Sequence, residues 1–429
     1  MAADVDLTRR IKEYARAVGF DAVGVARAEP FAEDRAVLRE RIAAGHFSGL
    51  SWFTAERADF SSDPRNLLPT ARSIISLAMS YRPQGLAQGD AGVGEKGSPR
   101  GRISAYAWGR DYHAVLKERM ERVVVFMRDA CGPAQQARTL VDTARILDRA
   151  AARRAGVGWV GKHSNVITKA AGSWVFLGEI LTELELEPDE PLRTNCGSCD
   201  LCMRACPTGA IVAPYVVDSN RCISYLTIEH RGAIPRELRP LMGNWIFGCD
   251  LCQDVCPPNL RPGVPAHEEF RCAGLPGPKG PARGPDRARA GPSFRAGPGA
   301  ADPAPEQDDA SPGTPELIPL LTISPEEFRR RFGRTPVKRA KREGLQRNVA
   351  VALGNSGDRA AVPALARALC EAAPLVRAHA AWALGRLGGA DAAAALRSAL
   401  QAEEDGAVRA EIEAALTELY HATSSPGSG

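Results

Sequence analysis

The chain has 429 residues, of which 44% are hydrophobic, and this length and composition allow two to four folded domains with ordinary buried cores. Its 55 lysines and arginines nearly balance 51 aspartates and glutamates, so the net charge of +4 says little about partners for the chain as a whole. No stretch approaches the roughly 20 consecutive apolar residues of a membrane-spanning helix, so we expect no membrane association.

Residues 1–190 are expected to form an α/β domain. The segment carries an Arg9-Arg10 pair, but no apolar run follows it, whereas Leu7, Ile11 and Ala15 share one face of a helix. We therefore predict a folded N-terminal helix rather than an export signal. A cytoplasmic location follows, in which the cysteines stay reduced and available for metal.

Further strands and a helix are predicted in the same region. Apolar patterning predicts an apolar stretch over 19–25, strands over 73–81 and 173–177, and an amphipathic helix over 113–128. Asp111 is expected to cap that helix, and His113 is more often structural than a ligand at such a position.

Residues 141–167 hold the first candidate for chemistry. Asp142 ends a strand-like run before an amphipathic helix, so it is either a helix cap or a catalytic carboxylate, and the residues alone favour the cap. Glycines at 156, 158 and 161 crowd around Trp159 and Lys162. They follow a helix, so they are not a dinucleotide fingerprint. They predict a tight turn or backbone that approaches something large and flat.

The most informative pattern lies in residues 191–262, which hold eight of the eleven cysteines. One run reads Cys-x2-Cys-x2-Cys-x3-Cys-Pro, a lone cysteine follows, and a second run reads Cys-x2-Cys-x3-Cys-Pro. The first run has the bacterial ferredoxin spacing, in which the fourth cysteine ligates the other cluster. We therefore predict two [4Fe–4S] clusters with crossed ligation. One cluster takes Cys196, Cys199, Cys202 and Cys256; the other takes Cys206, Cys222, Cys249 and Cys252.

Zinc is the alternative for cysteine pairs of this kind, but the first run is too dense for an ordinary zinc finger. The segment is short, so we expect metal to hold it together more than an apolar core does. Three cysteines lie outside the pattern and are expected to be buried or incidental thiols: Cys131, Cys272 and Cys370.

Residues 263–312 change character and are rich in Pro, Gly, Ala and Arg. Such a composition buries too little apolar area to offset the entropy of ordering, so we predict a flexible linker or insertion.

Residues 313–423 are expected to be a helical-repeat domain with a basic segment in front. Residues 351–365 align with 382–396 at a period of 31, and a weaker third copy begins at Val408, which predicts HEAT-like helix pairs. The segment 325–348 carries nine lysines and arginines interleaved with apolar residues. It is either a solvated basic face or a phosphate-binding surface, and a folded RNA recognised by its shape suits the second reading.

Taken together, these residues resemble the epoxyqueuosine reductase family. The resemblance covers nearly the whole chain outside 263–312. It is carried by VDTARILDRAAARRAGVGWVGK, GSWVFLGEI, NCGSCDLCMRACPTGAI, RCISYLTIEHRG, GCDLCQDVCPPN and RNVAVALGNSGD.

The resemblance implies an activity and an architecture. The family reduces epoxyqueuosine to queuosine at the wobble position of tRNA. We accordingly expect a multidomain α+β protein: an α/β cobalamin-binding catalytic domain (1–190), a ferredoxin-like domain with two [4Fe–4S] clusters (191–262), and C-terminal α-helical HEAT-like repeats that bind tRNA (313–423). Electrons would come from an external donor, and we expect a monomer.

The resemblance also implies roles for single residues. Asp142 becomes the proton donor, which reverses the capping interpretation, and shielding beside the corrinoid is expected to raise its pKa. The corrinoid is expected between residues 157–162 and the cluster domain. Its matched contacts are Arg57, Tyr106, Asp142, Ser164, Ser224 and Asp250. For tRNA we expect contacts from His230, Arg231, Lys338, Arg339, Arg342 and Arg347.

Three rival interpretations remain at this point. A corrinoid reductive dehalogenase would use the same cofactors on a small molecule, but the missing export signal and the added helical repeats argue against it. A plain electron-transfer ferredoxin leaves residues 1–190 and 313–423 without a purpose. A tRNA-binding module with structural clusters predicts tRNA binding without corrinoid.

Overall fold

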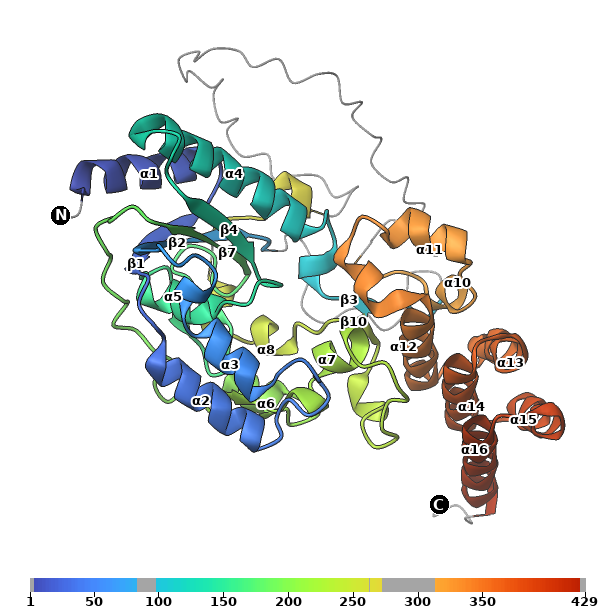
Figure 1. The fold of residues 1–429 in the computed structure, drawn as a ribbon. Coiled ribbons are helices and arrows are strands. Elements are labelled where there is room, and N and C mark those ends of the chain that lie inside the picture. Colours follow the sequence, from blue (N-terminus) through green and yellow to red (C-terminus); the bar gives the residue numbers. More distant parts are fainter. Residues whose placement is uncertain (1–3, 83–97, 262, 272–312, 425–429) are drawn as a thin grey trace.

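The computed structural model describes residues 4–82, 98–261, 263–271 and 313–424. Figure 1 shows a mixed helix-and-sheet body that contains the N-terminal region, a cluster-binding segment beside it, and a helical array that extends to the C-terminus. The expected multidomain arrangement is confirmed. No helix in the described ranges is both long enough and apolar enough to span a membrane.

A four-stranded antiparallel sheet forms the centre of the N-terminal domain. Its order is β1 (Ala22–Arg27), β2 (Ser73–Ser80), β7 (Val175–Thr182) and β4 (Ala137–Val141). β2 is buried along its whole length because helices cover both faces of the sheet, which explains why its sequence holds only apolar residues and small serines. The strands predicted over 73–81 and 173–177 are confirmed as β2 and the start of β7.

Helices cover both faces of this sheet. On one face lie α1 (Val5–Ala17) and α4 (Tyr112–Cys131), side by side in Figure 1, and on the other lies α5 (Asp148–Arg154). Asp111 caps α4 by accepting a hydrogen bond from the His113 amide, as predicted. Further elements of this domain are α2 (Ala32–Ala43), α3 (Ala55–Ser61), the β5 (Trp159–Val160) and β6 (Val166–Ile167) hairpin, β3 (Arg102–Ile103) and the 3-10 helix η2 (Ala105–Ala107).

The cluster-binding segment is built of short elements, as expected for a region held by metal. They are α6 (Leu201–Ala205), β8 (Ile211–Ala213), β9 (Val216–Val217), α7 (Ile223–Ile228), β10 (Trp245–Phe247), α8 (Leu251–Asp254) and α9 (Pro257–Leu260). β10 pairs in parallel with β3, so this segment is joined to the N-terminal domain through backbone hydrogen bonds.

The start of the expected linker is ordered. Residues 263–271 pack against the N-terminal domain, where Phe270 is buried with its ring 4.7 Å from that of Phe176. The prediction of a linker from residue 263 is wrong for these nine residues, because two of them, Ala266 and Phe270, are apolar and find buried positions. Residues 272–312 lie outside the described residues.

The predicted helical repeats are confirmed. After α10 (Leu317–Leu321), α11 (Pro325–Phe332) and the 3-10 helix η6 (Pro336–Ala340) come α12 (Lys341–Ser356), α13 (Val362–Glu371), α14 (Pro374–Leu387), α15 (Ala390–Ala402) and α16 (Gly406–Ser424). Figure 1 shows α12, α14 and α16 in one row with α13 and α15 beside them.

The repeated glycines explain how closely that row packs. A Cβ at Gly354 would lie 2.8 Å from the ring of Trp382, and a Cβ at Gly385, one repeat later, would lie 2.8 Å from Ala415. Glycine is therefore required at both positions for neighbouring helices to approach each other.

Candidate active site

A cavity of about 170 Å³ opens in the N-terminal domain at the edge of the sheet, near the end of β4. Aromatic rings and carboxylates from α4, α5, η2, β7 and the segments that follow β2 and β4 line it. The lining residues are Tyr81, Tyr106, Tyr112, Asp142, Asp148, Arg149, Asn165, Val166, Ser173, Val175, Phe176 and Leu177. The structure thus brings Tyr106 and Asp142, two of the residues expected from the sequence, into one cavity.

Asp142 holds its place through side chains of the first turn of α4. The Tyr112 hydroxyl donates a hydrogen bond to Oδ2, and Nε2 of His113 lies 2.7 Å from Oδ1. Its side chain is 38% exposed, so the carboxylate is open to the cavity. The capping interpretation from the residues alone is wrong, because α5 begins six residues later, after Leu147, and has no side-chain cap.

Opposing effects set the charge state of Asp142 in the protein itself. Burial alone would raise the pKa of this carboxyl, but hydrogen bonds from His113 and Tyr112, together with nearby positive charge, outweigh burial and lower that pKa. The upward shift expected for Asp142 shielded beside a corrinoid stays a prediction. Asp142 is an ionised carboxylate at neutral pH, with its negative charge stabilised by its neighbours.

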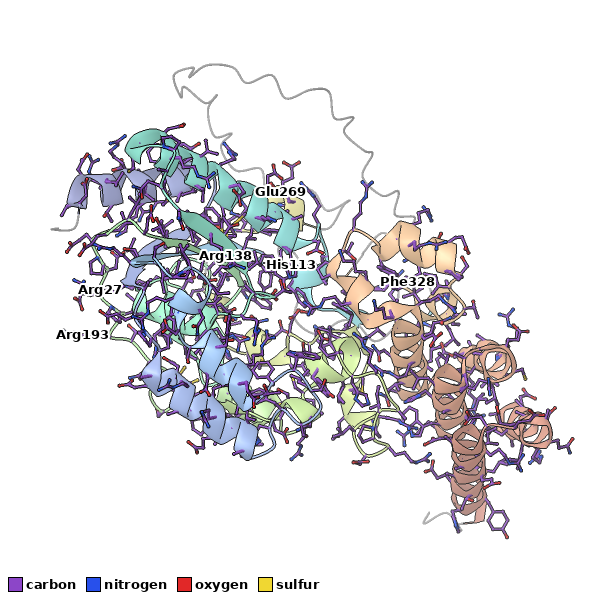
Figure 2. All side chains as sticks on the ribbon, in the orientation of Figure 1. Arg27, His113, Arg138, Arg193, Glu269 and Phe328 are labelled. Atoms are coloured by element: carbon purple, nitrogen blue, oxygen red, sulfur yellow. The ribbon has the colours of Figure 1, made fainter. Side chains whose placement is uncertain are left out.

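His113 is a site residue that the sequence reasoning treated as structural. Its Nδ1 lies 2.8 Å from Oδ1 of Asp111, and its Nε2 faces Asp142, so it sits between two carboxylates. Burial works to lower the pKa of His113, but these two partners outweigh it and raise that pKa to about 9. His113 is thus an imidazolium at neutral pH, with both ring nitrogens donating. Figure 2 shows it at the end of α4 that faces the C-terminal helices.

Tyr112 was missed altogether. Its ring stacks between that of His113, at 4.2 Å, and that of Phe176, at 4.4 Å, and this aromatic stack fixes the direction of its hydroxyl toward Asp142. The available signal was the run Asp111-Tyr112-His113 at the start of a helix, where a polar cap is followed by two groups able to donate hydrogen bonds.

Two further carboxyl groups lie close to Asp142. Asp148 lines the cavity, and burial raises its pKa. Glu179 of β7 is fully buried; neither carboxyl oxygen has a hydrogen-bond partner among the described residues, and burial raises its pKa well above the ordinary value. Both are acids that favour the protonated form, in contrast to Asp142.

The other residues expected at the corrinoid do not line the cavity. Arg57 of α3 lies over the ring of Phe53, at 5.9 Å. Ser164 has a left-handed backbone with φ of 64°, and its carbonyl and hydroxyl oxygens accept hydrogen bonds from Arg149, which does line the cavity. The carbonyl of Ser224 accepts a hydrogen bond from the hydroxyl of Thr227 within α7.

Asp250 acts beneath the cavity wall. It is buried and accepts hydrogen bonds from the Ser104 hydroxyl, at 2.5 Å, and the Ala105 amide, at 2.7 Å. Burial raises its pKa to about 6. Its side chain therefore fixes the segment that presents Tyr106 rather than pointing into the cavity.

The eight patterned thiols lie near enough to affect one another's pKa, mostly within the two predicted sets, although Cys252 also responds to Cys202 of the other set. Burial, followed by the negative charges of Cys196, Cys202 and Cys199, raises the pKa of Cys256 to about 12. In the second group, burial and then the charge of Cys222 raise the pKa of Cys252, and Cys249 also responds to both of these thiols. Burial, and to a lesser extent the charge of Cys206, raises the pKa of Cys222. Within the described ranges, no three side chains of His, Cys, Asp or Glu are close enough to hold a single metal ion. A [4Fe–4S] cubane joins thiolates that are farther apart than the ligands of one ion.

The cluster-binding segment forms part of the support of the cavity wall. Gln253 of α8 accepts hydrogen bonds from the Ser173 hydroxyl, at 2.9 Å, and the Tyr81 hydroxyl, at 3.4 Å. Asn259 of α9 also contacts Ser173 through its amide side chain. Since Ser173 and Tyr81 both line the cavity, one hydrogen-bonded layer separates the thiol-bearing helices from it.

The residues expected to touch tRNA divide by exposure. Arg231 and Lys338 are 52% and 46% exposed. His230 is half-buried with its Nε2 2.9 Å from the Ala233 carbonyl, while Arg339 pairs with Glu229 and Arg342 with the Gln346 side chain.

The expectation that Arg347 contacts tRNA is wrong. Arg347 is fully buried and donates hydrogen bonds to the carbonyls of Leu226, His230 and Gly232. Because the guanidinium of Arg347 is buried and its hydrogen bonds go to these carbonyls, Arg347 cannot reach a nucleic acid. Its role is to join α12 to the chain that follows α7.

A redox segment with eight thiols in ferredoxin spacing, placed against a cavity lined by tyrosines and carboxylates, defines an iron–sulfur oxidoreductase. Residues 195–259 match a family described as a 4Fe-4S double cluster binding domain, and residues 338–417 match HEAT repeats. Residues 62–143 match the family described as epoxyqueuosine reductase QueG, DUF1730.

Whole-length relatives give the same result. The chain is 37% identical to an epoxyqueuosine reductase of Xanthomonas campestris (89% of this chain, 97% of that one) and 33% identical to one of Bacillus cereus (96% and 97%). It also resembles a solved selenomethionine-labelled epoxyqueuosine reductase, with a TM-score of 0.82, 32% identity, and 96% and 99% of the two chains covered. The chain belongs to the epoxyqueuosine reductase family.

Proposed function

We propose that this chain reduces epoxyqueuosine to queuosine at the wobble position of tRNA. The observation that supports this most is the cavity, in which Asp142, hydrogen-bonded to His113, faces a space that adjoins the two-cluster segment. A relative at 32% identity and a TM-score of 0.81, covering 97% of this chain and 99% of its own, was solved with an epoxyqueuosine-modified tRNA-Tyr stem loop. Family membership makes the small-molecule dehalogenase the weaker candidate.

The two clusters are proposed to carry electrons one at a time to the cavity. We assign Cys196, Cys199, Cys202 and Cys256 to one cluster and Cys206, Cys222, Cys249 and Cys252 to the other, as the mutual effects of the thiols support. The electrons enter from an external low-potential donor, and the chain acts as a monomer. A cytoplasmic location suits thiolate ligands, which need a reducing compartment.

Cobalamin is the group we propose for the cavity. The residues fit a large ring with polar edges: Tyr81, Tyr106 and Tyr112 supply flat aromatic walls with hydroxyl groups. In the neighbouring β5–β6 region, the indole nitrogen of Trp159 and Nε2 of His163 are buried without a partner among the described residues. A corrinoid bound there would supply redox-active cobalt to the reduction. Tyr106 and the Ser164 segment, fixed by Asp250 and Arg149, are the proposed supports.

The chain's own residues handle protons. Converting an epoxide to an alkene takes two electrons and two protons and releases water. As a C–O bond breaks, negative charge develops on oxygen, and a proton delivered there lowers the barrier. Asp142 is the exposed acid group of the cavity and is proposed to deliver it. In a solved Bacillus subtilis epoxyqueuosine reductase, the catalytic loop that bears an aspartate is swung out of the active site.

Basic residues beside the cavity are proposed to hold the tRNA backbone. Lys338 and Arg339 of η6 reach the start of α4 and the neighbourhood of Asp142, and Arg231 extends from the loop after α7. Phosphate contacts of this kind fix the register of the nucleic acid and weaken with salt. His230 and Arg342 remain candidates at the same surface.

The test is a mass measurement on the modified nucleoside. The anaerobically reconstituted chain is incubated with cobalamin, a strong reductant and epoxyqueuosine-containing tRNA, and the tRNA is digested to nucleosides. We expect the nucleoside to lose the mass of one oxygen. An unchanged mass, with clusters and corrinoid both shown to be bound, would overturn the proposal.

A further inference from the structure

We infer that His113 is the proton reservoir of the active site, which recharges Asp142 and is held in place by Asp111 and Lys338. This inference rests on the proposed function, since it supplies the protons that the reduction consumes. It assigns the stored proton to the histidine rather than to the aspartate.

The geometry is a chain of alternating charges from three parts of the sequence. Nζ of Lys338 in η6 lies 2.7 Å from Oδ2 of Asp111, whose Oδ1 lies 2.8 Å from Nδ1 of His113. Nε2 of His113 lies 2.7 Å from Oδ1 of Asp142, which follows β4 and lines the cavity. The C-terminal module thus contacts the far end of a hydrogen-bonded path that leads into the cavity.

The two carboxylates that contact His113 favour a proton on its ring. On its own helix Asp111 attracts the proton, and across from it Asp142 does the same, so the pKa of His113 is raised to about 9. Tyr112 and the positive charges of His113 and Arg339 keep the pKa of Asp142 low. Lys338 faces Asp111 and lies farther from the ring. At neutral pH the proton therefore resides on the imidazole.

The remaining acids nearby do not compete for this role. Glu179 and Asp148 are held in low-dielectric positions that raise their pKa values, and neither hydrogen-bonds His113. His113 is itself 26% exposed, so solvent can return a proton to it after each transfer.

The proton transfer balances with the electrons of the reduction. As the C–O bond breaks, the developing oxyanion takes a proton through Asp142, and Nε2 of His113 supplies that proton and becomes neutral. His113 then takes up a second proton from solvent and passes it by the same route, so that oxygen leaves as water. The two electrons come from the low-potential external donor by way of the clusters. Asp142 ends the cycle ionised, as it began.

The sign of the pH dependence follows from the raised pKa. His113 carries its proton below a pH of about 9 and loses it above, so the rate of the reduction step falls as the pH rises through that value. A single-turnover experiment with pre-reduced holoenzyme and epoxyqueuosine-containing tRNA measures this limb directly, since neither electron delivery nor product release then limits the rate.

Two variants and one matched control make the experiment decisive. His113→Gln keeps a polar side chain but has no titratable proton. We expect the rate to fall about 100-fold and the pH-dependent limb near 9 to disappear. Asp111→Asn keeps the helix cap, because asparagine caps as well as aspartate, but removes one negative charge. His267→Gln is the control, since His267 also lies 2.7 Å from an aspartate, Asp21, but does not line the cavity. It should keep the wild-type rate and limb.

A second readout does not depend on turnover. Histidine-selective NMR of the holoprotein follows the titration of His113, which we expect near 9 in the wild type and lower in Asp111→Asn, with the rate limb of that variant moving by the same amount. A His113→Gln enzyme with the wild-type rate, or a limb that stays in place while the NMR titration moves, would overturn the relay. So would a wild-type His113 that titrates at its ordinary value. Failure of the proposed function is distinct: the nucleoside mass would then not change even in the wild type.

Discussion

The cluster-binding segment and the cavity beside it are specified by the chain in opposite ways. The eight thiols lie within 61 residues, and their short spacings alone predict the iron–sulfur chemistry. The cavity instead depends on contacts made by the fold. Asp142, which lines it, hydrogen-bonds His113, 29 residues away, and Lys338 contacts Asp111 at a separation of 227 residues. Local spacing therefore identifies the cofactor segment, whereas only the fold identifies the group that handles protons.

The largest expected effect concerns the cluster ligand that lies farthest along the sequence from the others of its set. Cys256 is 54 residues from Cys202 but is assigned to the same cluster. Cys256→Ser replaces a thiolate with a poor iron ligand, so we expect bound iron to fall from about eight to about four per chain and turnover to be lost. Iron analysis and electron paramagnetic resonance of the reduced protein check this.

Cys370→Ser is the matched control, because Cys370 is an exposed thiol outside the pattern. It should leave iron content and turnover unchanged. If Cys256→Ser retained full iron content, the crossed ligation would be wrong.

The second prediction concerns Arg347 and Arg231, which the sequence analysis both expected to contact tRNA. Arg347→Met leaves the carbonyls of Leu226, His230 and Gly232 without their donor inside the protein, and we expect a loss of about 3 kcal/mol in the free energy of unfolding. Arg231→Met removes a half-exposed charge, so stability should change by less than about 0.5 kcal/mol while tRNA affinity falls.

Denaturant unfolding and tRNA binding at two salt concentrations separate these outcomes. An Arg347→Met protein of wild-type stability that loses tRNA affinity would show that Arg347 acts at the surface after all.

The smallest predicted effect compares a closely packed glycine with an unpacked one in the same helix, α12. A Cβ at Gly354 would lie 2.8 Å from Trp382 and 2.9 Å from Ala383, so Gly354→Ala should destabilise the protein by about 1–3 kcal/mol. Gly344 has no such neighbour within 4 Å, and Gly344→Ala should stabilise α12 by about 0.5–1 kcal/mol. Thermal unfolding of both variants measures the difference, and equal effects would contradict the close packing of α12 on α14.

Much of the fold was predictable because it depends on periodic patterns. The buried strand β2, the capped helix α4 and the 31-residue repeat all follow from apolar spacing and cap chemistry. The ordering of residues 263–271 was not, because two apolar side chains among prolines and charges do not indicate where they will be buried.

The site was predictable only in part, for a physical reason. Asp142 was placed by resemblance, but the sequence did not show that its pKa also depends on His113 and Tyr112, which lie on another element. Arg347 lies in a basic run of the sequence. In the fold it is buried, and carbonyls 115 to 121 residues away accept its hydrogen bonds. A pattern along the chain carries no information about partners at such separations.

The most direct test of the account compares wild type with Asp142→Asn in one turnover. Both proteins, loaded with clusters and corrinoid and fully reduced, are mixed with epoxyqueuosine-containing tRNA, and cluster oxidation state and nucleoside mass are followed together. The account predicts that both proteins bind both cofactors and accept electrons, while the modified nucleoside loses one oxygen in the wild type at a rate at least about 100-fold above that of the variant. Equal rates of oxygen loss in the two proteins would contradict it.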